Sequence, residues 1–160
     1  MHFTAHRRFF MTQQLLPGLI NGLLNGGIAW AAHRGESAIG LWDRGAYASD
    51  LLATGLLLPG ISWFILRPLL RRQALVGKAP VLDGLAAPWL ARWMSPSLWG
   101  GGLAIGLMGL ALLGGGSVLA MQALGAPAFD GNGYALFKGA YGSLVTVILQ
   151  PVMVFAALRR

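Results

Sequence analysis

Hydrophobic residues are concentrated in four long runs along the chain, and most of the charges lie in the segments between them. Each run is long enough to form a helix of the ~20 residues that a bilayer requires. Glycine and proline recur inside the runs, which transmembrane helices tolerate better than soluble helices do. The pattern therefore predicts an all-α membrane protein with four transmembrane helices, at about 9–32, 50–70, 98–120 and 134–157.

The composition supports a membrane protein. Of the 160 residues, 56% are hydrophobic and 11% are charged, with a mean hydropathy of +0.62. A soluble domain would carry about 25% charged residues. The first run follows basic residues, as a secretory signal does, but it is longer than the ~7–15 apolar residues of a signal. We expect it to be a retained membrane span.

Basic residues are distributed unevenly among the connecting segments. Nine of the 12 lie at the two ends of the chain or between the second and third runs, and three lie elsewhere (Arg34, Arg44 and Lys138). By the positive-inside rule, both termini are expected in the cytoplasm, with the protein in the inner or plasma membrane. The net charge of +7 would then meet anionic lipid headgroups, and no nucleic-acid partner is expected.

The long connection between the second and third runs contains the sequence DGLAAPWLARWMSPSLW. Asp83 or Pro88 is suited to begin a short helix that places Trp89 and Trp93 against lipid. Tryptophan is enriched at membrane interfaces, so a short cytoplasmic interfacial helix is predicted here. A segment that docks a partner protein is the alternative.

The two halves of the chain resemble each other when one is shifted by 88 residues without a gap. Both halves end on Leu-Arg-Arg, and glycines and leucines of the first and third runs coincide. This predicts two tandem two-helix hairpins related by a pseudo-twofold axis along the membrane normal. The alternative is that any two hairpins rich in leucine and glycine look alike. The expected organisation is a single polytopic membrane domain with repeat 1 at about 9–72, a cytoplasmic linker at about 73–97 and repeat 2 at about 98–160.

The first hairpin ends in the sequence LRPLLRR, which includes Pro68, Arg71 and Arg72. This end resembles small bacterial membrane proteins that are built from two-helix units. The resemblance implies a small bacterial-type membrane protein and assigns no role to individual residues.

Asp50 and Lys138 occupy corresponding positions at the start of the second and fourth runs. Near the non-cytoplasmic boundary, each charge costs less than the ~2.5–3.5 kcal/mol of the bilayer centre. If the hairpins pack about the pseudo-twofold axis, the two side chains approach each other at an outer mouth. Alternatively, each side chain extends separately to the interface.

Glycines recur at helical spacing in the first and third runs. Residues four apart lie on one face of a helix, so Gly18, Gly22 and Gly26 form a flat strip of the GxxxG type that permits close helix packing. We expect the first and third spans to pack at the centre of the molecule, with the second and fourth outside. The candidate packing residues are Gly18, Gly22, Gly26, Gly102, Gly106 and Gly114.

Two amides, Asn21 and Asn25, flank the first glycine strip and need polar partners inside the membrane. The fourth run offers Thr146 and Gln150. Hydrogen bonds between spans average only ~0.6 kcal/mol, so these four residues would serve as polar glue. The alternative is a polar path or ligand pocket near the midplane, lined in part by carbonyls freed at Pro59 and Pro151, where each proline would interrupt its helix.

The sequence has no arrangement of residues that is typical of catalysis. It contains no cysteine, no phosphate-binding loop and no metal motif, so no enzyme activity, cofactor or metal is expected. Two functions remain. The first is an oligomeric transporter or channel-like protein for a small solute, which the polar stripe favours. The second is a non-catalytic membrane subunit that docks or stabilises a larger membrane complex.

Overall fold

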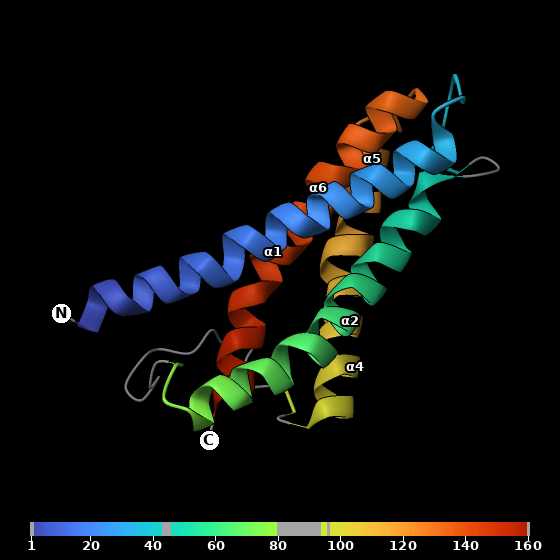
Figure 1. The fold of residues 1–160 in the computed structure, drawn as a ribbon. Helices are drawn as coiled ribbons and strands as arrows, with labels where there is room; N and C mark the ends of the chain where they lie inside the picture. Colours follow the sequence, from blue (N-terminus) through green and yellow to red (C-terminus); the bar gives the residue numbers. More distant parts are fainter. Residues whose placement is uncertain (1, 43–45, 80–93, 96, 160) are drawn as a thin grey trace.

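A computed structural model describes residues 2–42, 46–79, 94–95 and 97–159 of the chain, and most of these residues are helical. These residues contain no strand, and one isolated antiparallel bridge joins Ile39 to Phe129. The helices in chain order are α1 His2–His33, α2 Tyr47–Leu75, α4 Leu98–Met108, the π-helix η1 Gly109–Gly115, α5 Gly116–Ala123 and α6 Gly131–Leu158 (Figure 1).

Four helical stretches are long and apolar enough to cross a membrane, which confirms the predicted four-span, all-α architecture. The third stretch is formed by α4, η1 and α5 in succession. Pro59 and Pro151 lie inside α2 and α6, which continue through them, so the expected interruption of these helices is wrong. The four stretches are Gln14–His33, Tyr47–Leu75, Leu98–Ala123 and Gly131–Leu158.

Side-chain caps determine where the third and fourth spans begin. The Ser97 hydroxyl accepts a hydrogen bond of 2.9 Å from the Gly100 N–H, and Asp130 Oδ1 accepts one of 2.9 Å from the Gly133 N–H. Each cap satisfies one of the backbone donors that a helix leaves free at its first turn. As a result, α6 begins at Gly131, earlier than the hydrophobic pattern alone indicates.

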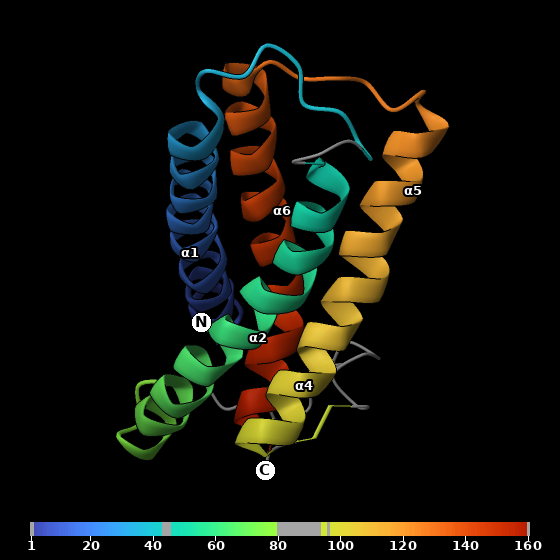
Figure 2. The same cartoon turned by 90° about the vertical axis from the view of Figure 1, so that its right-hand side faces the viewer.

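The fourth span is the innermost helix. Within its most apolar window 61% of the residues are buried, against 17% for the first span. α1 packs along α6, whereas α4 and η1 pack along α2, and α2 also contacts α6 (Figures 1 and 2). α1 and α4 are not among the packed pairs. The expected packing of the first and third spans at the centre is therefore wrong, because the second and fourth spans lie inside.

The packing follows small residues on the facing helices. A side chain on Gly22 would meet the carbonyl of Gly139 at 3.0 Å and collide with the Ser143 hydroxyl, so α1 lies almost in backbone contact with α6. In the same way, a side chain on Gly114 or Gly109 would meet the α2 backbone around Gly55. Each glycine face thus packs against the inner helix beside it.

The connections between α1 and α2 and between α5 and α6 pack together at one end of the molecule. The backbones of Ile39 and Phe129 exchange hydrogen bonds of 2.7 and 3.1 Å, and the Tyr47 hydroxyl donates one of 2.9 Å to the Pro127 carbonyl. The C-terminal end of α6 lies at the opposite end of the molecule, and α1 slants away from the connections toward the N-terminus (Figures 1 and 2). The interfacial helix predicted around residues 83–93 lies outside the described residues.

Candidate functional site

An ion pair between α2 and α6 joins the two charges that the sequence places at corresponding positions. Lys138 Nζ lies 2.6 Å from Asp50 Oδ1. It also donates to the Thr54 hydroxyl at 2.6 Å and to the Asp50 carbonyl at 3.1 Å. An ammonium group has three N–H donors. The three acceptors therefore match the full donor capacity of Lys138, which explains how its charge is accommodated at 3% exposure.

The Asp50 carboxylate is held on its other side by Tyr134, whose hydroxyl donates to Oδ2. Tyr134 lies one helical turn before Lys138, just as Asp50 lies one turn before Thr54, so each helix contributes two stacked side chains to the cluster. The Asp50 side chain is 41% exposed, whereas that of Lys138 is 4% exposed. The cluster is therefore a buried cation with an anion on its accessible side.

Neither hydroxyl of this cluster was identified from the sequence as a partner of the ion pair. Tyrosine near the end of a span is typical of membrane interfaces in general. The spacing of four residues from Tyr134 to Lys138, matched by Asp50 to Thr54, is a signal that could have identified both.

The two amides of α1 form hydrogen bonds within the contact with α6. Asn21 Nδ2 donates to the Thr146 hydroxyl at 2.9 Å, and that hydroxyl donates to the Gly142 carbonyl at 2.9 Å. Asn25 Nδ2 donates to the Asn21 carbonyl at 2.8 Å, and its side chain lies against Gly142, where a β-carbon would meet it at 2.9 Å. The structure thus brings Asn21, Asn25 and Thr146 together on one side of α6.

Gln150 lies one turn beyond Thr146 on α6 and is 2% exposed. Within the described residues, the buried polar or charged side chains are Thr54, Lys138, Thr146 and Gln150, three of which belong to α6. Residues four apart are neighbours on a helix surface. Lys138, Gly142, Thr146 and Gln150 therefore follow one another along the innermost helix, and the three of them that carry side chains are polar or charged.

The candidate packing glycines divide between two helix contacts. Gly18, Gly22 and Gly26 face α6, where β-carbons would meet Val147, Ser143, Gly139 or Ala135. The glycines of the third span face α2 instead. There, β-carbons on Gly102, Gly106 and Gly114 would meet Phe64 or Trp63, Leu56, and Leu51 or Leu52.

In the part of the chain that the structure describes, no three His, Asp or Glu side chains are grouped so that they could hold a metal ion. Comparison of the chain with protein-family models, with curated proteins and with solved structures gave no match. The Asp50–Lys138 cluster is therefore the feature of the described residues that bears most directly on function.

Proposed function

We propose that the protein is a small membrane transporter or channel-like protein for a small solute. The observation that carries this proposal is the ion pair in which a buried Lys138 meets a partly exposed Asp50. Ionisable residues within membrane spans are rare, and they commonly mark ion or substrate pathways. The exposed side of the Asp50 carboxylate gives a solute or a proton access to the pair, at what we propose is the outer mouth.

The polar residues of α6 support a path that begins at this pair. Thr146 and Gln150 continue from Lys138 toward the other end of the helix, and Asn21 meets Thr146 from α1. Polar groups that line a constriction replace part of the hydration shell of a passing solute. Four spans enclose little volume, so the proposed path is completed in an oligomer of this chain.

We further propose that the two hairpins are structural repeats about a pseudo-twofold axis along the membrane normal. Two pairs of close contacts support it. Gly18 of α1 approaches Ser143 and Val147, and Gly106, 88 residues later, approaches Leu56 and Gly60. A shift of 88 residues would relate Ser143 and Val147 to positions 55 and 59, each one residue from the observed partner. Such an axis would pass between α2 and α6, near the Asp50–Lys138 pair.

The proposed orientation places both termini and the α2–α4 connection in the cytoplasm, where basic residues meet anionic headgroups. Gly35 and Lys78 lie in connections at opposite ends of the molecule, and a side chain on Gly35 meets nothing within 4 Å. Single cysteines at these positions test the orientation. An impermeant maleimide applied to intact cells should label Gly35→Cys and spare Lys78→Cys, and the reverse pattern would invert the topology.

The transport proposal is tested with purified protein in liposomes. Stopped-flow light scattering after osmotic shock reports permeability to each of a series of small polyols, amides and monovalent ions. The protein should raise permeability to one class saturably, and Asp50→Asn should abolish that increase. Glu36→Gln is the matched control, because it removes an exposed carboxylate at the same end of the molecule. Wild-type permeability equal to that of empty liposomes for every solute contradicts transport.

A second candidate function is that of a non-catalytic subunit in a larger membrane complex. It is favoured by the first span, which contacts α6 on one side and exposes large apolar side chains such as Leu16, Leu23 and Ile28 elsewhere. In this case, the Asn21–Thr146 bond would serve as polar glue. Purification in a mild detergent should then yield a stoichiometric protein partner, and the purified chain should leave liposome permeability unchanged.

A further inference from the structure

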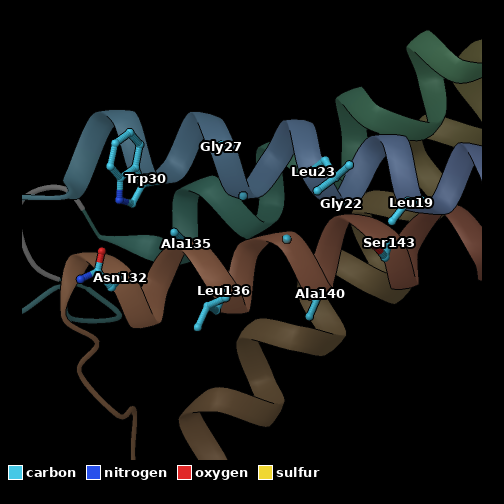
Figure 3. Close-up of a pocket in the computed structure, with 12 residues that line it drawn as sticks. Leu19, Gly22, Leu23, Gly27, Trp30, Asn132, Ala135, Leu136, Ala140 and Ser143 are labelled. Carbon is cyan, nitrogen blue, oxygen red and sulfur yellow. The ribbon is translucent and has the colours of Figure 1, made fainter.

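A groove with a volume of about 660 Å³ runs along the molecular surface between α1 and α6 (Figure 3). This volume lies within the ~300–1,000 Å³ typical of ligand sites. Small residues such as Gly26 and Gly139 keep the two helices close beneath it, and Leu23 and Leu136, both largely exposed, flank it. The lining is almost wholly apolar, so a ligand that fills it must be apolar along most of its length.

The groove has the length of one membrane leaflet. It extends from Leu19 to Trp30 on α1, and at 1.5 Å per residue this distance is about 16 Å. Half of the ~30 Å hydrocarbon core of a bilayer is about 15 Å. On α6 the lining runs from Asn132 to Ser143, the first half of the Gly131–Leu158 span, so the groove extends from about the middle of that span to its end at the connection between α1 and α2.

The exposed polar groups gather at the headgroup end, beside the connection between α1 and α2, whereas the Ser143 hydroxyl at the other end donates a hydrogen bond to the Gly18 carbonyl. Trp30 and Asn132 lie at the headgroup end, and Leu19 and Ser143 lie at the midplane end (Figure 3). The Arg34 guanidinium lies over the Trp30 ring, 5.2 Å from its centroid. One end of the apolar groove thus carries an exposed indole, an exposed amide and a guanidinium. Their N–H groups can donate hydrogen bonds to the oxygens of a phosphodiester.

The neighbouring carboxylates are engaged by other groups. Glu36 contacts His33 at 3.0 Å, and Asp130 accepts the hydrogen bond that caps α6. The charge of Arg34 is consequently available to a headgroup phosphate. A helix from a second copy of the chain would fit this end poorly, because it would have to desolvate Arg34 or place an acidic residue opposite it.

We propose that the groove between α1 and α6 binds one acyl chain of a phospholipid, with the lipid phosphate at Arg34. The lipid comes from the leaflet on the side of the α1–α2 connection. It would cover the glycine-rich line along which α1 and α6 meet, and would hold α1 against the inner helix. The site is independent of the Asp50–Lys138 cluster, so its test stands apart from that of the proposed transport.

The acyl-chain arm of the test uses Gly27, which lines the groove and where a β-carbon meets nothing within 4 Å. Gly27→Leu therefore fills the groove without a clash. Gly116→Leu is the matched control, because Gly116 on α5 is equally open and lies outside the groove. The full-length proteins are placed in phosphatidylcholine nanodiscs doped with a phosphatidylglycerol that carries a photoreactive diazirine on one acyl chain. Crosslinked residues are then identified by mass spectrometry.

Crosslinks in the wild type should concentrate on the groove residues of α1 and α6. Gly27→Leu should reduce their yield about tenfold, which corresponds to about 1.4 kcal/mol, and Gly116→Leu should leave it unchanged. Circular dichroism and gel filtration verify that both variants fold and keep the wild-type size. Crosslinks spread evenly over the apolar surface would overturn the proposal, since they indicate ordinary annular lipid. A change of oligomer size in Gly27→Leu alone would overturn it in favour of a second copy.

The headgroup arm uses Arg34→Gln, with Arg72→Gln as a control that removes one positive charge at the other end of the molecule. The same protein is titrated with the photoreactive phosphatidylglycerol to saturation. Arg34→Gln should raise the half-saturating lipid fraction several-fold and leave the crosslinked residues the same, whereas Arg72→Gln should do neither. Equal effects of the two substitutions would show general charge attraction and would remove Arg34 from the site.

Discussion

The Asp50–Lys138 pair makes a quantitative prediction about single and double substitutions. Asp50→Asn keeps the shape of the side chain and removes its charge. Lys138 would then keep the Thr54 hydroxyl and the Asp50 backbone carbonyl as acceptors, without a counter-ion. Breaking a buried pair in this way costs about 3–5 kcal/mol. Because the Asp50 side chain is 41% exposed, water reaches the pair. We therefore expect the free energy of unfolding to fall by about 2–3 kcal/mol, at or below the lower end of that range.

Lys138→Met removes the buried charge instead and leaves a carboxylate that is partly exposed and still accepts from Tyr134. This should cost about 1 kcal/mol, because the relief of a desolvated charge offsets most of the three contacts that Lys138 loses. In the double variant Asp50→Asn/Lys138→Met no buried charge remains. Replacing a buried pair by uncharged residues is often close to neutral. The double variant should therefore lose no more than about 1 kcal/mol, so the two single effects, about 3–4 kcal/mol together, should fail to add by about 2–3 kcal/mol.

The assay is reversible unfolding in mixed detergent micelles, followed by tryptophan fluorescence, with Glu36→Gln as the exposed-carboxylate control. A double variant whose loss equals the sum of the two single losses would refute the argument, since the charges would then be energetically independent. So would an Asp50→Asn loss no larger than that of Glu36→Gln. Transport measured on the same variants separates the roles. If the stable double variant retains full solute flux, the pair is structural.

Two further predictions concern the contact between α1 and α6. Gly22→Leu should lower the free energy of unfolding by about 1–3 kcal/mol, because the leucine overpacks against Ser143. Leu23→Ile, on the exposed side of α1, should change it by less than about 0.5 kcal/mol. Equal thermal denaturation midpoints of the two variants would contradict the close contact. Asn21→Leu/Asn25→Leu should fold with near-normal stability, because bonds of this kind contribute only about 0.6 kcal/mol each. If that folded variant retains full solute flux in liposomes, the amides are polar glue rather than part of a path.

The distribution of hydrophobic residues along the chain predicted the number and location of the spans, because length and hydropathy alone determine whether a helix can cross a bilayer. It could not predict which spans pack together. The strip of Gly18, Gly22 and Gly26 identifies a surface suited to close contact, but its partner depends on small residues of another span, here Gly139 and Ser143. Those residues belong to a series of small residues at four-residue spacing, Ala135, Gly139 and Ser143, but such spacing does not by itself say which glycine-bearing span it meets.

The site was partly predictable. The shift of 88 residues aligned Asp50 with Lys138 and indicated that they could meet across an axis. The contributions of Tyr134 and Thr54 depend on where two helices lie relative to each other, which neither helix encodes alone. The π-helix η1 had no sequence signal either, since GLALLGG reads as a continuation of the span. Its Gly109 and Gly114 lie against the backbone around Gly55, an arrangement that only the tertiary contact reveals.

The pairing of α1 with α6 has a consequence for the order of events during synthesis. The first helix enters the membrane with Asn21 and Asn25, but Thr146, the acceptor for Asn21, is made 125 residues later. In hydrocarbon, unsatisfied polar groups are costly, so an incomplete chain carries exposed amides on its first helix and an unpaired Asp50 on its second. Translation of α6 supplies the partners of both at once. A chain truncated before Gly131 therefore leaves unpaired the polar groups of α1 and α2 that α6 satisfies, so α6 links the completion of two helix contacts to a single step of synthesis.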